Sequence, residues 1–162
     1  MITPRHRGGW VIFLSFIVAF LFTSIPLPEW AARFRPDWLG LVLIYWCLAL
    51  PHRVGVGTGW MAGLFLDAAK GTLLGQHALA LSVVAFLALK THRRIRVFPI
   101  LQQAVSIMLF LLVNQLLVVW INGIIGYPPR DWWYLAPALG GMLFWPWIFV
   151  ILRDLRRRFQ VS

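Results

Sequence analysis

The sequence predicts an all-α, polytopic integral membrane protein with six transmembrane helices. Of its 162 residues, 60% are hydrophobic and only 12% are charged, whereas soluble domains carry roughly 25% charged residues. The apolar residues form runs separated by short polar or basic segments. Ten Trp and twelve Phe fit the aromatic belts found at membrane–water interfaces. We therefore expect a single six-helix transmembrane domain over residues 1–162.

The six expected spans follow the apolar runs in chain order. The first run follows a basic head, which is also typical of a signal peptide, but it is long and no Ala-x-Ala cleavage site follows it. Pro26 and Pro28 end that run, because proline lacks a backbone N–H donor and restricts the residue before it. The expected spans cover about residues 10–26, 38–50, 54–69, 76–90, 99–122 and 132–152.

The second and third runs are shorter than the roughly 20 residues of a plain membrane crossing. They form either two thin spans partly surrounded by protein or one re-entrant hairpin. In the hairpin, His52 and Arg53 would lie at membrane depth, where a central arginine costs about 2.5–3.5 kcal/mol. Two crossings, with Arg53 at the water edge, are therefore favoured.

The basic residues indicate topology rather than nucleic-acid binding. The net charge is +10, but the bases fall in short clusters between apolar runs. The positive-inside rule then places both termini in the cytoplasm, with the segment Lys90–Arg96 forming the most basic loop. The larger group of bases comprises Arg5, Arg7, Arg53, Lys90, Arg93, Arg94, Arg96, Arg153, Arg156, Arg157 and Arg158, against Arg33, Arg35, Lys70 and Arg130 on the opposite side.

A ladder of glycines at four-residue steps marks the third run. Residues spaced i, i+4 lie on one helix face, and small residues let helix backbones approach closely in a membrane. We therefore expect a packing face for another span of the chain or for a partner helix. Its members are Gly55, Gly59, Gly63, Asp67, Gly71 and Gly75.

Asp67 is the only carboxylate within the apolar spans, and three interpretations of it remain open. It pairs with Lys70 near the outer water edge, makes a polar contact to a neighbouring helix, or serves as a catalytic, proton or ion site. Asn114 is a candidate for an interhelical hydrogen bond. No nucleophile elbow, phosphate loop or zinc spacing is present. We therefore expect no enzyme activity, catalytic residue, metal or cofactor.

Three blocks of the sequence resemble the MreD family of bacterial rod shape-determining membrane proteins. The first runs from Tyr45-Trp46 to Gly59 (YWCLALPHRVGVGTG), and the second is Gly63-x3-Asp67-x3-Gly71-x2-Leu74-Gly75. The third is Trp145-Pro-Trp-Ile-Phe149 with Arg153. The first two blocks together are specific, whereas the glycine ladder alone is a weak signal.

The resemblance implies a scaffold of the bacterial inner membrane without enzymatic activity. It implies a six-helix fold like that of the substrate-binding subunits of ECF vitamin transporters. It also implies a place in the Rod complex, or elongasome, with MreC as the direct partner and with MreB, RodA and its penicillin-binding transpeptidase. The alternative function is a small-molecule-binding subunit of an ECF-type transporter, which would need several convergent polar groups.

Overall fold

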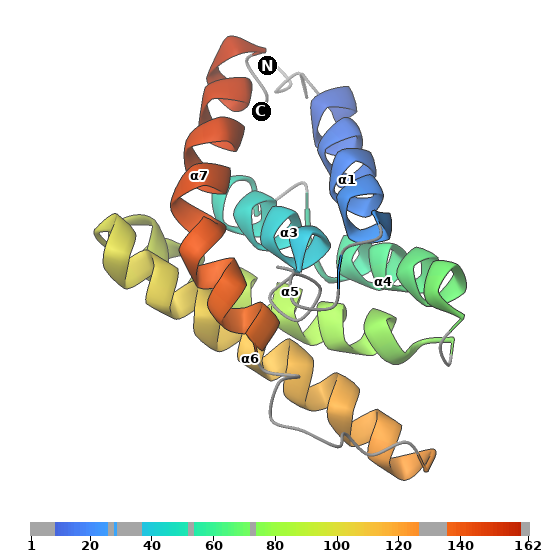
Figure 1. Ribbon diagram of the computed structural model, residues 1–162. Coiled ribbons are helices and arrows are strands. Elements are labelled where there is room, and N and C mark those ends of the chain that lie inside the picture. The colour runs from blue at the N-terminus through green and yellow to red at the C-terminus, as the bar shows by residue number, and fades with distance from the viewer. Residues whose placement is uncertain are drawn as a thin grey trace, which may run out of the picture.

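The computed structural model describes residues 9–25, 28, 37–51, 54–71, 74–126 and 136–159. Within these ranges the chain forms six α-helices and no strand (Figure 1). This confirms the all-helical fold class. His52, Arg53, Arg33, Arg35 and Arg130 lie outside the described residues. The helices are α1 (Gly9–Ser24), α3 (Trp38–Ala49), α4 (Val56–Lys70), α5 (Gln76–Arg96), α6 (Ile100–Ile124) and α7 (Ala136–Arg158).

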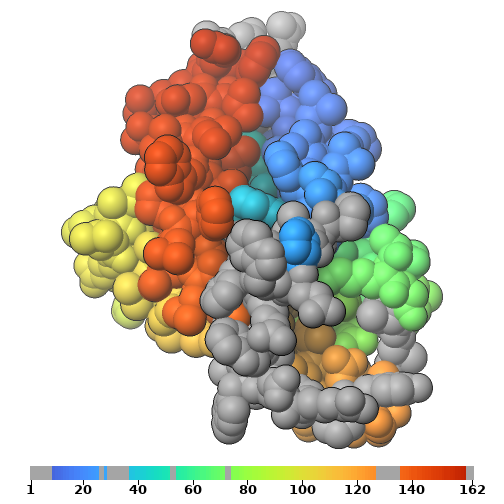
Figure 2. All heavy atoms as spheres, viewed as in Figure 1, coloured from blue at the N-terminus to red at the C-terminus, as the bar shows by residue number. Residues whose placement is uncertain are grey.

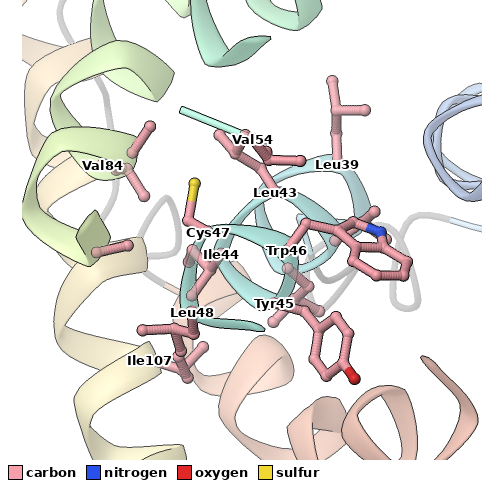
Figure 3. Close-up of a cluster of buried hydrophobic side chains, with 14 of the residues drawn as sticks. Leu39, Leu43, Ile44, Tyr45, Trp46, Cys47, Leu48, Val54, Val84 and Ile107 are labelled. Atoms are coloured by element: carbon pink, nitrogen blue, oxygen red, sulfur yellow. The ribbon is translucent and has the colours of Figure 1, made fainter. Parts of the chain in front are cut away.

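Helix α3 lies at the centre of the bundle. Every residue from Leu39 to Leu48 is buried, and Figure 3 shows α3 side chains packed with Val84 of α5 and Ile107 of α6. A helix that is apolar all round suits a position surrounded by other helices or by lipid. The other helices provide that enclosure, which is how 12 residues, about 18 Å of helix, suffice at this position.

The remaining helices pack around α3 in pairs. Helices α4 and α5 run antiparallel and share the most extensive contact, followed by α6 with α7 (Figure 1). Helix α1 packs on α3, where the Ser15 hydroxyl accepts a 2.8 Å hydrogen bond from the indole of Trp46. The start of α1 and the end of α7 meet through an edge-on contact of Trp10 with Phe159, with ring centroids 4.9 Å apart.

Two basic segments lie within helices rather than in loops. The expected loop Lys90–Arg96 is the end of α5, and the basic tail Arg153–Arg158 is the end of α7. Lysine and arginine are good helix formers, and their charge complements the carbonyl end of the helix dipole. The apolar runs therefore predicted the apolar parts of α5 and α7, but the predicted C-terminal ends lie one to two turns before the observed ends.

The outer surface of the bundle is apolar. Helices α6 and α7 are long and apolar enough to cross a membrane, and only 28% of the most apolar stretch of each is buried inside the molecule. Large side chains such as Leu101, Trp120, Leu143 and Trp147 are exposed. Helices α1 and α3 are apolar but shorter. This surface indicates a membrane protein, while six crossings remain a prediction.

Candidate functional site

The first half of the glycine ladder packs against α5. A Cβ atom added at Gly59 would lie 2.9 Å from the backbone oxygen of Leu81. One added at Gly63 would lie 2.5 Å from the carbonyl carbon of His77 and closer still to the backbone of Ala78. Both separations are too short for a real Cβ atom. The small-residue face predicted from the sequence is therefore filled by the chain's own helix.

The second half of the ladder does not continue that face, because the chain reverses after Lys70. Gly71 ends α4 with φ of 68°, and Gly75 precedes α5 with φ of 101°. Glycine adopts these left-handed angles without a steric penalty. Gly55 precedes α4 in an extended conformation. The expectation of one continuous i, i+4 face from Gly55 to Gly75 is thus wrong at its C-terminal end.

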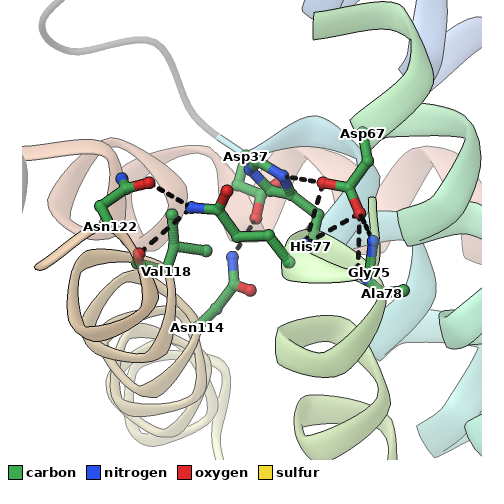
Figure 4. Close-up of polar contacts among 9 residues, drawn as sticks. Asp37, Asp67, Gly75, His77, Ala78, Asn114, Val118 and Asn122 are labelled. Atoms are coloured by element: carbon green, nitrogen blue, oxygen red, sulfur yellow. Dashed lines mark hydrogen bonds and ion pairs between the residues drawn. The ribbon is translucent and has the colours of Figure 1, made fainter. Parts of the chain in front are cut away.

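The Asp67 carboxylate lies fully buried at the start of α5. It accepts hydrogen bonds from the backbone N–H of Gly75 at 2.9 Å and of His77 at 3.0 Å (Figure 4). The Nδ1 atom of His77 lies 2.6 Å from the same carboxylate. The first N–H groups of a helix lack partners within the helix, and its N-terminal end attracts negative charge. Asp67 supplies both the acceptors and the charge.

The interpretation of Asp67 as a partner of Lys70 at the water edge is therefore wrong. Lys70 is exposed, whereas the carboxylate has no exposed surface and points toward α5. The carboxylate and the His77 ring tie the end of α4 to the start of α5. In the part of the chain that the structure describes, no three metal-ligating side chains gather around them or elsewhere.

A second set of polar contacts joins α6 to its neighbours. The Asn114 amide donates a 2.7 Å hydrogen bond to Asp37, which in turn accepts from the backbone of Gly40 and so caps α3. The Gln76 amide donates to Asn122 at 2.7 Å (Figure 4). Asn114 thus makes an interhelical contact of the kind expected. Sequence reasoning missed the Gln76–Asn122 pair, whose only signal is two polar residues at the ends of apolar runs.

Two apolar grooves flank α1. The larger, of about 520 Å³, lies between α1 and α7. Figure 2 shows it as a hollow between the blue and red helices, with α3 in cyan behind it. Ser15, Ala19 and Val18 of α1 face Trp147 and Ile151 of α7 across it. The smaller groove, of about 410 Å³, lies between α1 and α4.

Comparison with known proteins assigns the chain to a family. The family model described as "rod shape-determining protein MreD" matches residues 4–155. The chain belongs to the MreD family. It is similar to the rod shape-determining protein MreD of Haemophilus influenzae, with 32% identity over 153 residues, which is 94% of each chain. No solved structure matches the chain.

Membership of the MreD family implies a role in determining rod shape and a place in the rod shape complex. The blocks that carried the resemblance have clear structural places. Tyr45 and Trp46 belong to the buried central helix, and Gly63 and Asp67 form the α4–α5 contact. Trp145 is buried in α7. The MreD motifs therefore coincide with the contacts that hold this bundle together.

Proposed function

We propose that this MreD-family chain is a non-catalytic scaffold of the bacterial inner membrane that docks MreC and cell-wall synthases through its helix faces. Family membership supports the link to rod shape. The apolar outer surface supports a protein surrounded by lipid and by other transmembrane helices. MreB, RodA and its penicillin-binding transpeptidase are further proposed members of the same assembly.

The observation that carries the docking proposal is the groove between α1 and α7. Because α5 already fills the face at Gly59 and Gly63, that face is closed to a partner in this structure. Lipid gives little hydrophobic drive for helix association, so close packing over small residues has to supply it. The groove has Ser15 and Ala19 on one wall. We propose that the membrane anchor of MreC lies in it.

The proposed topology has six crossings and both termini in the cytoplasm. The described basic segments at the ends of α5 and α7 lie at one end of the bundle, since Arg96 and Arg153 line one cleft. Lys70 ends α4 at the turn into α5, near the opposite end of α5 from Arg96. By the positive-inside rule, this uneven distribution of basic residues supports a cytoplasmic location for the end of the bundle that carries Arg96 and Arg153. An arrangement like that of ECF substrate-binding subunits is part of the same proposal.

Cysteine cross-linking in cells tests the docking groove. Cysteine replaces Leu14, Val18 or Ile151, which are exposed in the groove. The matched controls are Leu109 and Leu116, which are equally exposed on α6. The native Cys47 is buried and gives little background.

We expect MreC to cross-link to the groove positions several times more strongly than to the α6 positions. Equal cross-linking at both sets, or a preference for α6, would contradict docking in the groove. Bulky V18W should also reduce co-purification of MreC and round the cells, whereas L109W should leave both unchanged.

A further inference from the structure

A small polar cleft opens at the basic end of the bundle. It has a volume of about 140 Å³ and is walled by α3, α5, α6 and α7. Three arginines contribute to its lining: Arg96 from the end of α5, and Arg153 and Arg156 from α7. Among the described residues that line it, none is Asp or Glu. The cleft therefore concentrates positive charge, unlike the two apolar grooves beside α1.

One buried polar atom of the cleft lacks a partner among the described residues. The Nε atom of Arg153 is buried and makes no hydrogen bond. Tyr45, which also lines the cleft, is 3% exposed. Leaving buried donors unpaired costs about 1–3 kcal/mol each, and more for charged groups. An anion in the cleft would satisfy the Arg153 donor.

The walls of the cleft are held in place by other contacts. The Trp145 indole donates to Gln103 at 3.0 Å, and the Gln103 amide donates to the backbone oxygen of Ile95 at 3.1 Å. These bonds link α7, α6 and the end of α5. The Arg153 guanidinium lies over the Phe149 ring, 5.5 Å from its centroid. These contacts hold the side chains that wall the cleft in fixed positions.

The cleft lies where the apolar part of α7 gives way to its basic end. Val150 and Ile151 are exposed apolar residues, and Arg153 follows within one turn. Arg96 likewise precedes the apolar run of α6, which starts at Ile100. Phospholipid phosphates occupy this depth of a membrane, and basic pockets between transmembrane helices are suited to anionic headgroups.

We propose that this cleft binds the phosphate group of an anionic phospholipid. The planar guanidinium groups of Arg96, Arg153 and Arg156 donate paired hydrogen bonds to phosphate oxygens. The Tyr45 hydroxyl donates a further one from the floor. The acyl chains extend along the exposed apolar surface of the bundle. The site is separate from the docking groove, and its occupancy does not depend on MreC.

Native mass spectrometry on the purified full-length protein tests the site. The probes are phosphatidylglycerol and the zwitterionic phosphatidylcholine. R153Q/R156Q removes two charges from the cleft, and R157Q/R158Q removes two charges from exposed positions of the same helix. We expect phosphatidylglycerol affinity to fall roughly fivefold per cleft arginine, or roughly 25-fold for the pair, with little change in the control. Similar losses in both variants would overturn the proposal, because they would indicate diffuse surface charge.

A single substitution tests the site independently of whether the double variant R153Q/R156Q folds. Arg96 and Arg94 are both exposed near the end of α5, but only Arg96 lines the cleft. R96Q should lose roughly fivefold in phosphatidylglycerol affinity, while R94Q should match the wild type. Equal affinities for R96Q and R94Q would overturn the site.

Inorganic phosphate distinguishes a lipid from a soluble ligand. Under the proposal, excess inorganic phosphate leaves phosphatidylglycerol bound, because the acyl chains anchor the lipid. Displacement of the lipid by phosphate, together with thermal stabilisation of the lipid-free protein by phosphate, would overturn the lipid assignment in favour of a soluble phosphorylated ligand.

Discussion

Substitution G63A probes the closest contact between α4 and α5. The new Cβ atom would lie 2.5 Å from the carbonyl carbon of His77, whereas carbon atoms pack best at about 3.5–4.0 Å. The obstacle is backbone, so no rotamer change relieves it. The two helices therefore have to separate by about 1 Å at this point, which corresponds to the overpacking penalty of about 1–3 kcal/mol.

The separation also weakens the Asp67 cap, one turn away. Its hydrogen bonds from Gly75 and His77 measure 2.9 and 3.0 Å, and stretching them by about 1 Å takes them beyond hydrogen-bonding range. A bond to a charged group contributes about 1.5–3 kcal/mol. Counting one such bond and subtracting the gain in helix propensity from alanine, about 1 kcal/mol, we expect G63A to lower the free energy of unfolding by about 1.5–5 kcal/mol.

Thermal unfolding in a mild detergent measures this effect. The matched control is G57A on the same helix, where an added Cβ atom would meet nothing within 4 Å. G57A should be neutral or stabilising by up to about 1 kcal/mol. If G63A melts at the temperature of the wild type or of G57A, the backbone contact at Gly63 and the reasoning built on it are refuted.

Three further substitutions test the polar contacts and the turn, all by the same melting assay. D67N removes the charge at the start of α5 and should cost about 1–2 kcal/mol; an unchanged melting temperature would contradict a charge-dependent cap. G75A forces a left-handed φ on alanine and should cost about 1–2 kcal/mol, whereas G123A, in open helical space, should not destabilise. N114L removes a hydrogen bond to the Asp37 carboxylate and should cost about 1.5–3 kcal/mol; an unchanged melting temperature would contradict this contact.

The spacing of the second motif has a physical explanation in the α4–α5 turn. Gly63 lies one turn before Asp67 and lets α5 approach, so that the Asp67 side chain reaches the N-terminus of α5. Gly71 and Gly75 then provide left-handed residues at the two described ends of the reversal. The same four-residue spacing therefore serves two purposes, packing before Asp67 and chain reversal after it. A helical wheel drawn through all six positions cannot separate the two.

The proposed docking surface is the groove between α1 and α7 rather than the glycine face of α4, because α5 covers that face. A small-residue face can be filled by the chain itself or by a partner, and the i, i+4 pattern is identical in both cases. The backbone of Ala78 against Gly63 shows that the chain fills it here. One wall of the groove between α1 and α7 carries small residues at the same spacing, Ser15 and Ala19, but the spacing alone does not show that α7 stands opposite, because α1 and α7 lie far apart in the chain.

The sequence by itself determined the class of this protein and the order of its helices. The hydrophobic runs are long and contrast strongly with the basic segments. Transfer of apolar surface from water into the protein interior or into lipid dominates the folding free energy of such a chain. The motif at Gly63 and Asp67 also marked the third helix as one with a face for close packing, without identifying what fills that face. These are local or compositional properties, so they are visible without coordinates.

Only the tertiary structure decided what surrounds each side chain. Asp67 is four residues from Gly63 and three from Lys70 in the sequence, yet it accepts hydrogen bonds from Gly75, just before the next helix, and from His77 within that helix. Likewise, Arg96 and Arg153 lie 57 positions apart but line one cleft. Burial and pairing depend on how whole helices pack, and no local pattern encodes which distant backbone lies opposite a given residue.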